Sequence, residues 1–229
     1  MMGLKAYVRQ GLLAVGRRAP DWLLRKLGNI VSELELDSWL KAHGLEVRRF
    51  VSRREALFEL VASEVGQLPV LYLEFGVASG EATRVWSRLL KHPEAVLHGF
   101  DSFEGLPENW TEKNPKGMYG TGGVPPIIDD SRITFFKGWF ENTLSTYRAP
   151  KSDVVILNMD ADLYSSTIFV LRSLRHLVRP GTYLYFDEFA CYGHEEKAFR
   201  EFVEQTGFTF RLRGATPGLT NVRFQCVQA

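Results

Sequence analysis

Acidic side chains stand at the ends of four of the five apolar segments that we interpret as strands of a parallel sheet. Ligands of open α/β sheets bind outside the carboxyl ends of the strands, so these acids should gather at one edge of the sheet. Carboxylates there can accept hydrogen bonds, take up a proton or hold a cation. The acids are Glu74 and Asp101 at the ends of the first two segments, Asp160 and Asp162 after the fourth, and Asp187 and Glu188 after the fifth.

The acids after the fourth and fifth segments are the sharpest signal. Neighbouring strands lie about 4.8 Å apart, so Asp160 and Asp162 should meet the acidic pair at 187–188 if those strands are adjacent. Two bare carboxylates ~5 Å apart repel by roughly 3 kcal/mol at an effective dielectric of ~20. Such a cluster needs a proton, a basic partner or a cation. Ligands that are all oxygen favour a hard ion such as Mg²⁺ over zinc.

The acid cluster could also form without a metal ion. No Lys or Arg lies within the two acidic motifs, although Lys197 or Arg200 could fold back and neutralise them. Single members could instead cap helices or close turns. His194, in a predicted loop, is a second candidate for a general base, although a lone loop histidine is more often simply solvated.

The segment Leu71–Gly80 (LYLEFGVASG) is typical of a buried parallel strand, a tight turn and a helix start. Gly76 permits turn conformations that a side chain would forbid, and Gly80 permits a close approach to the backbone. The loop should aim free N–H groups at a polar ligand. Its Glu-x-Gly-x-x-x-Gly spacing resembles the first motif of class I S-adenosylmethionine-dependent methyltransferases, although such a glycine turn can also be purely structural.

Three further features border the expected ligand crevice. A carboxylate at the position of Asp101 usually accepts ribose hydroxyls, although Asp101 could instead cap a helix. Trp139 and Phe140, after the third strand, are candidates to flank an adenine ring or are ordinary core residues. Residues 104–132 form a long loop rich in Gly and Pro, for which we favour a substrate lid over a plain mobile loop.

The alternation of strands and helices predicts a doubly wound parallel sheet. We expect an N-terminal helical extension over residues 1–50 and one α/β domain over 51–229. The expected helices are two short ones within 1–28 broken at Pro20, then 32–44, one that Ser52 caps together with Glu55, 81–91 after the glycine turn, 166–178 and 195–207. The expected strands are 71–74, 95–100, 133–136, 154–159 and 183–186, with a closing pair at 208–212 and 222–227.

The first 28 residues carry six basic residues against one acid, Asp21, with apolar residues between them. This pattern is typical of a membrane-surface or partner-binding helix. We favour instead accessory helices that pack on the main domain or on a second subunit, the latter of which would give a homo-oligomer through these helices.

Composition excludes several classes of protein. The net charge of +1 gives no indication of nucleic-acid binding. Cys191 and Cys226 form neither a metal-type pair nor a disulfide framework, which fits a reducing cytoplasm. No apolar run approaches the ~20 residues that span a bilayer, and the N-terminus lacks the features of a signal peptide. We therefore expect a cytoplasmic protein.

Four further motifs make the resemblance specific: GFDSFEGLP at 99–107, KGWFENTL at 137–144, MDADLYSST at 159–167 and RPGTYLYFDEF at 179–189. With LEFGV at 73–77 they follow the order of the macrocin O-methyltransferase family, which the chain resembles over about 50–205. Known members methylate sugar hydroxyls on antibiotics. The resemblance implies a Rossmann-like methyltransferase fold, whose mostly parallel seven-stranded sheet ends in an antiparallel hairpin.

The resemblance also implies roles for particular residues. Asp160, Asp187 and Glu188 would hold Mg²⁺, and Asp162 would help to take the proton from the substrate hydroxyl. The family usually has a second aspartate at position 188 and a tyrosine at position 189, where Phe189 removes a hydroxyl from the site. The residues expected to bind S-adenosylmethionine are Glu74, Gly76, Ser79, Gly80, Asp101, Ser102, Gly138, Trp139, Phe140 and Asp160.

We therefore expect a magnesium-assisted, S-adenosylmethionine-dependent O-methyltransferase that acts on a hydroxyl of a glycosylated or polyol small molecule. A catechol-type phenol is an alternative acceptor, since a metal would chelate its adjacent oxygens. A nicotinamide-dependent oxidoreductase is disfavoured because the Gly-x-Gly-x-x-Gly motif is missing. A non-catalytic binding protein that kept the crevice is a further alternative.

Overall fold

The structure, a computed structural model, describes residues 4–229, which divide between His43 and Gly44 into two compact units. The first unit contains α1 (Leu4–Gly16) and α2 (Asp21–Ala42). The predicted break at Pro20 is confirmed, because Pro20 stands in an extended conformation directly before α2. Residues 1–3 of the predicted extension lie outside the described residues.

The region around residue 30 differs from the prediction. Instead of two helices, residues 21–42 form one helix. The Ser32 hydroxyl donates a hydrogen bond to the Gly28 carbonyl oxygen at 2.9 Å, so backbone and side chain both continue the helical pattern across the expected gap. One glycine inside a helix costs only about 1 kcal/mol relative to alanine, which is too little to end it. The helix ends before Gly44, which has a positive φ of 66°.

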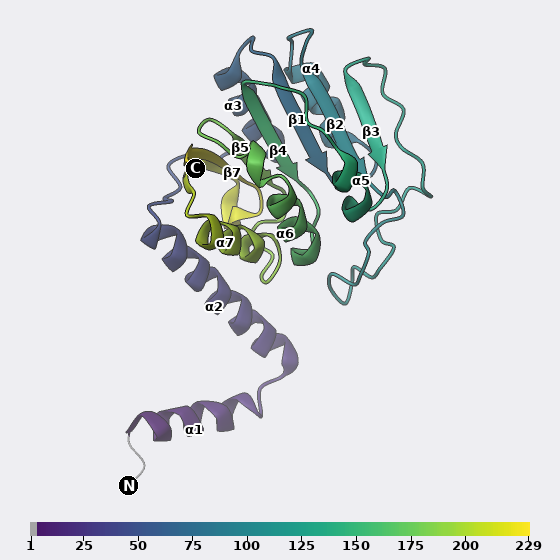
Figure 1. Ribbon diagram of the computed structural model, residues 1–229. Helices are drawn as coiled ribbons and strands as arrows, with labels where there is room; N and C mark the ends of the chain where they lie inside the picture. The colour runs from purple at the N-terminus through teal and green to yellow at the C-terminus, as the bar shows by residue number, and fades with distance from the viewer. Residues whose placement is uncertain (1–3) are drawn as a thin grey trace. The chain divides into compact units, whose positions relative to one another are not determined.

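The second unit is built on a seven-stranded sheet in the order β3-β2-β1-β4-β5-β7-β6 (Figure 1). The strands β1 to β5 run parallel to one another, whereas β7 is antiparallel to both β5 and β6. The predicted parallel sheet and closing hairpin are therefore confirmed. The strands are β1 Val70–Phe75, β2 Val96–Asp101, β3 Ile133–Lys137, β4 Val154–Met159, β5 Tyr183–Phe186, β6 Thr209–Ala215 and β7 Val222–Gln228.

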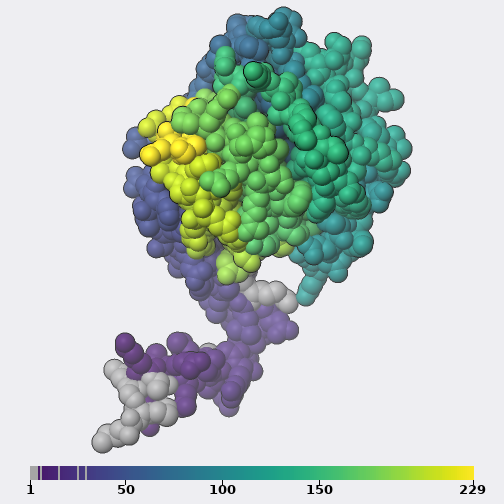
Figure 2. Space-filling model, viewed as in Figure 1, coloured from purple at the N-terminus to yellow at the C-terminus, as the bar shows by residue number. Residues whose placement is uncertain are grey.

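Helices cover both faces of this sheet, and in the space-filling view the elements of the second unit pack as one body (Figure 2). On one face, α5 contacts the sheet through Phe140 on Phe75, and α7 through Phe199 on Phe186. The helices α3 and α4 cover the opposite face. The helices are α3 Arg54–Val65, α4 Glu81–Leu89, α5 Phe140–Thr146, α6 Tyr164–Ser173 and α7 Glu195–Thr206, with short 3-10 turns at Arg175–Leu177 and Pro217–Leu219.

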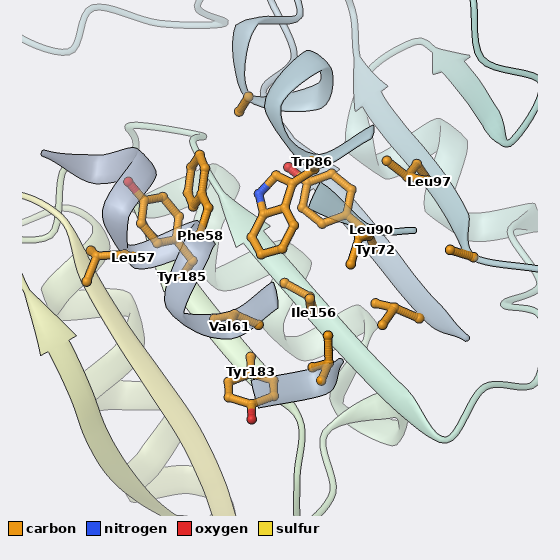
Figure 3. Packing of buried hydrophobic residues seen from close by; sticks show 14 residues of the cluster. Leu57, Phe58, Val61, Tyr72, Trp86, Leu90, Leu97, Ile156, Tyr183 and Tyr185 are labelled. Carbon is orange, nitrogen blue, oxygen red and sulfur yellow. The ribbon is translucent and has the colours of Figure 1, made fainter. Parts of the chain in front are cut away.

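Aromatic rings fill the layer between α3, α4 and the sheet (Figure 3). The fully buried indole of Trp86 packs between the rings of Phe58 and Tyr72, with centroids 5.0 and 5.1 Å away. The ring of Phe58 also meets Tyr185 edge-on at 4.8 Å. Such pairs add about 0.5–1.5 kcal/mol each beyond the burial of their area. They fix α3 and α4 on the sheet, and thereby the two helix N-termini that face its carboxyl edge.

Two local predictions were wrong at element ends. Ser52 does not cap α3, because Arg53 is the extended residue before the helix and makes no side-chain cap. Backbone pairing explains the late start: the Val51 N–H donates to the Ala215 carbonyl oxygen at 2.9 Å, which keeps this stretch extended. The helix predicted over 166–178 begins two residues earlier and ends at Ser173. The domain boundary at residue 50 stays a prediction.

The partly buried side chain of His98, on β2, should make the stability of the fold depend on pH. Its Nδ1 lies 2.8 Å from the Tyr147 hydroxyl oxygen, and burial lowers its pKa from 6.5 to about 4. The unfolded chain therefore binds a proton between these pH values that the folded chain does not. This stability contribution is complete above pH 6.5 and is lost as the pH falls towards 4.

We expect His98→Gln to lose less stability than the wild type when urea unfolding is repeated from pH 7 down to about pH 4.5. The control is His176→Gln, which removes an exposed histidine. An equally steep loss in the His98→Gln protein would contradict the assignment of this pH dependence to His98.

Candidate functional site

A cavity of about 570 Å³ opens at the carboxyl edge of the sheet, where β1 and β4 lie side by side. The chain runs outward from this pair on both sides, which makes it the topological switch point where open α/β sheets bind ligands. Gly80 and His194 are not among the lining residues. The predicted site residues that do line the cavity are Glu74, Gly76, Ser79, Asp101, Ser102, Gly138, Trp139, Phe140, Asp160, Asp162, Asp187 and Glu188.

The glycine turn after β1 is in direct contact with the chain leaving β4. Gly76 has a φ of 92°, and a Cβ atom built on it would lie 1.8 Å from the Asp160 carbonyl oxygen. The Asp160 N–H in turn donates to the Phe75 carbonyl oxygen at 2.9 Å. Only glycine fits here. Gly80 has a similar constraint, since its Cβ would lie 2.8 Å from Pro126 of the long loop.

Asp101 closes the turn from the side of β2. Its Oδ2 accepts hydrogen bonds from the N–H groups of Val77 and Ala78, both at 2.8 Å, and its Oδ1 accepts the Phe103 N–H at 2.7 Å. The expectation of free N–H groups in the turn is therefore wrong for these two residues, because a strand-end carboxylate already satisfies them. Oδ2 already accepts two hydrogen bonds, whereas Oδ1 accepts one and keeps a second lone pair, so Asp101 can still accept a ribose hydroxyl through Oδ1.

Glu74 is held more tightly than the sequence suggests. Its side chain is buried on the α4 side, where Oε2 accepts the hydroxyls of Tyr72 at 2.9 Å and Thr83 at 2.7 Å. Burial raises the pKa of Glu74 to about 7, and these two hydrogen bonds oppose the shift. Glu74 therefore links β1 to α4 as well as lining the cavity.

The acid cluster predicted after β4 and β5 forms as expected, because these strands are adjacent. The Asp187 N–H donates to the Met159 carbonyl oxygen at 3.0 Å, which holds the two strand ends together. Side chains alternate along a strand, so Asp160 and Asp187 continue the sheet face that bears α3. Asp162 and Glu188 complete the cluster in the same cavity.

Crowding and burial change the protonation of these acids. Burial, followed by the charges of Asp187 and Asp162, raises the pKa of Asp160 well above its usual range. Burial also raises the pKa of Asp162 to about 7, with Glu188 and Asp187 adding to the shift. The pKa of Glu188 rises for the same two reasons, burial and the charge of Asp187. The site therefore favours uptake of a proton or of positive charge.

Arg54, at the start of α3, supplies a positive charge that sequence reasoning missed. Its Nη1 lies 3.2 Å from Asp187 Oδ2 and 4.0 Å from Asp160 Oδ2, and its Nη2 lies 3.2 Å from Glu81 Oε2. The expectation that Lys197 could neutralise the cluster is wrong, because its Nζ lies 4.2 Å from the ring centroid of Tyr164. The charge of Arg200, the other candidate, acts on Glu196.

Other supporting residues also escaped the sequence analysis. Asp187 Oδ1 accepts the Tyr185 hydroxyl at 2.6 Å and the Asn221 amide at 3.1 Å. The buried Glu195 accepts the Glu188 N–H at 3.0 Å. Tyr185 could have been found, since it precedes Asp187 by two residues on the same strand face. The others come from distant segments and carry no local signal.

The chemistry of the cluster suits a hard divalent ion, because all of its donors are carboxylate oxygens. The geometry is less simple: within residues 4–229, no group of three or more His, Cys, Asp or Glu side chains is arranged to hold a metal ion. Both oxygens of Asp187 are already bonded, one to Tyr185 and Asn221 and the other to Arg54. A metal ion that replaced Arg54 as the partner of Asp187 Oδ2 would require the Arg54 side chain to turn away.

The long loop 104–132 forms one wall of the cavity. It folds back on itself through hydrogen bonds between Leu106 and both Met118 and Gly117. The Ser165 hydroxyl of α6 donates to Glu108 at 2.6 Å, which ties the loop to the domain. The loop residues that line the cavity are Gly105, Leu106, Pro107, Trp110, Met118 and Tyr119.

Two predicted features lie away from the cavity wall. His194 directly precedes α7, where its Nδ1 accepts the Tyr164 N–H at 3.3 Å. Phe189 is fully buried and packs against Phe199 and Phe224 in the core. The expectation that Phe189 removes a hydroxyl from the site is therefore wrong, since its ring points into the layer beneath α7.

The fold is that of known methyltransferases. The structure aligns with the O-methyltransferase NovP at a TM-score of 0.60 and 22% identity, over 76% of this chain and 80% of that one. It aligns with the calicheamicin methyltransferase CalS11 at a TM-score of 0.59 and 20% identity, over 86% and 91% of the two chains. At these identities the likeness establishes the fold alone, which is the methyltransferase fold expected from the motifs.

The resemblance to a particular family is confirmed over part of the chain. The family model described as macrocin O-methyltransferase (TylF) matches residues 127–214. This range contains the motifs at 137–144, 159–167 and 179–189, whereas those at 73–77 and 99–107 precede it. The match therefore covers the acids after β4 and β5.

Two O-methyltransferases from Streptomyces are similar in sequence to parts of this chain. The first is the 8-demethyl-8-(2,3-dimethoxy-α-L-rhamnosyl)-tetracenomycin-C 4'-O-methyltransferase of Streptomyces olivaceus, 28% identical over 107 residues, or 39% of this chain. The second is the demethyldecarbamoylnovobiocin O-methyltransferase of Streptomyces niveus, 24% identical over 163 residues, or 62% of this chain. The chain spans 40% and 60% of the lengths of these relatives.

The Arg54 contacts predict a specific loss of stability. Arg54→Met keeps most of the aliphatic stem but leaves Asp160 and Asp187 without their cation. We expect it to lower the free energy of unfolding by about 1–3 kcal/mol at neutral pH, less than for a fully buried pair because the Arg54 side chain is 26% exposed. Urea unfolding measures this change.

The neighbouring Arg53→Met is the matched control, because Arg53 is itself exposed and pairs with the exposed Glu59 and the half-buried Glu55, so its loss should leave stability nearly unchanged. Equal effects of the two substitutions would show that Arg54 does not stabilise the acid cluster.

Proposed function

We propose that this chain is an S-adenosylmethionine-dependent O-methyltransferase whose acceptor is a hydroxyl of a sugar-bearing small molecule. One observation carries the proposal: the glycine turn after β1 and the acids after β4 and β5 line a single cavity. The family match over residues 127–214 and the names of the two Streptomyces relatives, one acting on a rhamnosyl tetracenomycin, support the chemistry and the acceptor class.

We assign the methyl donor to the side of the cavity formed by β1 and β2. Asp101 would accept the ribose hydroxyls, while Gly76 lets the turn pass close to Asp160 at the wall of the cavity. Ser102 and Trp139 line the same cavity, and Trp139 would cover the adenine ring. Phe140 has a second role, because its ring packs edge-on against Phe75 at 5.7 Å in the core.

Asp162 is the base in this proposal. A sugar hydroxyl is a poor nucleophile until its proton begins to leave, so a carboxylate must stand beside the attacking oxygen. Asp162 lines the cavity, whereas His194 is not among the lining residues. As the hydroxyl oxygen attacks the methyl carbon, the C–S bond breaks and the proton passes to the Asp162 carboxylate. The products are a methyl ether and S-adenosylhomocysteine.

We further propose that Asp160, Asp187 and Glu188 hold Mg²⁺ once Arg54 has turned away. The bound ion would orient the acceptor hydroxyl and lower its pKa. The carboxylate chemistry supports this assignment, and the raised pKa values of Asp160 and Glu188 indicate that a positive charge would be accommodated there. The remaining walls, including the loop 104–132 as a lid, would hold the acceptor and exclude water.

The assignment of Asp162 is tested by Asp162→Asn. We expect transfer of labelled methyl groups to glycosylated acceptors to fall by about 10²–10⁴-fold, while binding of S-adenosylhomocysteine, measured by calorimetry, stays unchanged. Asp153→Asn, at the opposite end of β4, is the matched control and should keep full activity. Methyl transfer to phenols but not to sugars would overturn the acceptor class. Tight binding of NAD without S-adenosylhomocysteine would end the proposal.

The metal assignment is tested without an activity assay. Mn²⁺, used as a paramagnetic substitute for Mg²⁺, should bind the wild type and bind Arg54→Met several-fold more tightly, because the competing cation is gone. Asp187→Asn should abolish this binding. If Mn²⁺ binds neither the wild type nor Arg54→Met, the metal assignment fails, whereas the assignments of Asp162 and of the methyl donor stand or fall by the previous test.

A further inference from the structure

Positive charge is concentrated in the first 28 residues of this chain. Six of the 28 Lys and Arg residues but one of the 27 acids lie within residues 1–28. This segment therefore has a formal charge of +5, whereas the remaining chain has a charge of −4 and the whole chain +1. A basic segment at one end of a chain that is otherwise slightly acidic indicates a local anionic partner rather than a general affinity of the whole protein for anions.

The N-terminal unit exposes large apolar side chains on both helices. On α1, Leu12 is 70% exposed and Val8 is 54% exposed, and on α2 Leu34 is 64% exposed. Isolated exposed apolar residues are ordinary, but a contiguous series marks an interaction surface. Figure 2 colours this segment purple, and its exposed large apolar residues are Tyr7, Val8, Leu12, Leu13, Trp22, Leu24, Leu27, Ile30, Val31 and Leu34.

Basic residues and exposed apolar residues together line an open groove between α1 and the start of α2. Its apolar lining comes from Val8, Leu12, Leu13 and Leu24, and its charged lining comes from basic residues alone. Its complete lining is Lys5, Val8, Arg9, Leu12, Leu13, Gly16, Arg17 and Leu24. An occupant that satisfies this groove must offer both hydrocarbon and negative charge.

We propose that α1 and the first part of α2 dock on the surface of an anionic lipid bilayer. Acyl chains would take up the apolar side chains, and anionic headgroups would pair with Lys5, Arg9 and Arg17, as in other amphipathic helices that lie in the interface. None of the described helices is long and apolar enough to cross a membrane.

A second copy of this chain is the competing occupant, and the charge pattern disfavours it. Two such grooves placed face to face would bring the same three cations together and supply no carboxylate from the groove linings. Like charges within a Debye length of about 8 Å at physiological salt repel one another. The experiment described next therefore also tests whether these helices form a homo-oligomer instead.

The experiment is sedimentation of the full chain with lipid vesicles. Vesicles of phosphatidylcholine alone are compared with vesicles that also contain phosphatidylglycerol. We expect binding to the anionic vesicles only, and its loss in high salt. Arg9→Gln with Arg17→Gln should weaken the partition coefficient by about 25-fold, since each basic residue near such a surface contributes about fivefold. Leu12→Gln should weaken it by about tenfold or more.

Arg148→Gln with Lys151→Gln is the matched control, because it removes the same charge from exposed positions of the second unit and should leave vesicle binding unchanged. Equal urea midpoints of all variants exclude misfolding as the cause. Two results would overturn the proposal: no binding to anionic vesicles, or binding that is insensitive to the loss of Arg9 and Arg17. A dimer in light scattering that Leu12→Gln dissociates, without vesicle binding, would assign the groove to a second copy.

Discussion

Mutual repulsion among carboxylates is the constraint around which the carboxyl edge of the sheet is organised. Asp160, Asp162, Asp187 and Glu188 line one cavity because β4 and β5 are adjacent. Because their negative charges repel one another, the cluster needs a bound proton or a nearby cation. Arg54 supplies such a cation from the start of α3. The packing of α3 on the sheet therefore determines the electrostatics of the site as well as the stability of the core.

A second constraint is the narrow space between β1 and β4. The turn after β1 passes so close to Asp160 that a side chain at Gly76 would collide with its carbonyl oxygen. Backbone strain gathers around the same cavity, where the non-glycine residues Ala78, Tyr119 and Asp162 have φ values of 45°, 66° and 57°. Such residues cost on the order of 1–3 kcal/mol each and persist where the surroundings hold them. These strained residues line the same cavity as the converging acids.

The two units of the chain differ in where their charged side chains lie. In the second unit, charged groups such as Glu74 and Asp187 point inward and are bonded by neighbouring side chains. In the first unit, Lys5, Arg9 and Arg17 stay exposed beside apolar residues. The inward charges suit a small reacting molecule, whereas the outward charges suit an extended anionic surface. Catalysis and attachment can thus be studied with separate variants.

The sequence predicted the sheet well because short apolar segments with acidic ends are local signals. The strands β4 and β5 have the predicted limits, and the acids that follow them meet as expected. Predictions at helix ends were weaker. Ser52 lost its capping role because Val51 pairs with Ala215, which lies 164 residues further along the chain. A cap depends on the backbone conformation before the helix, and distant strand pairing can override it.

What the sequence determined by itself was the order of the strands along the chain, the glycine turn and the identity of the converging acids, since each depends on neighbours within a few residues. Only the tertiary structure decided that Arg54 is their cation, that Asp101 binds the turn, and that Phe189 belongs to the core. These contacts join segments up to 133 residues apart. Their energies depend on distance in space, which no local pattern of residues encodes.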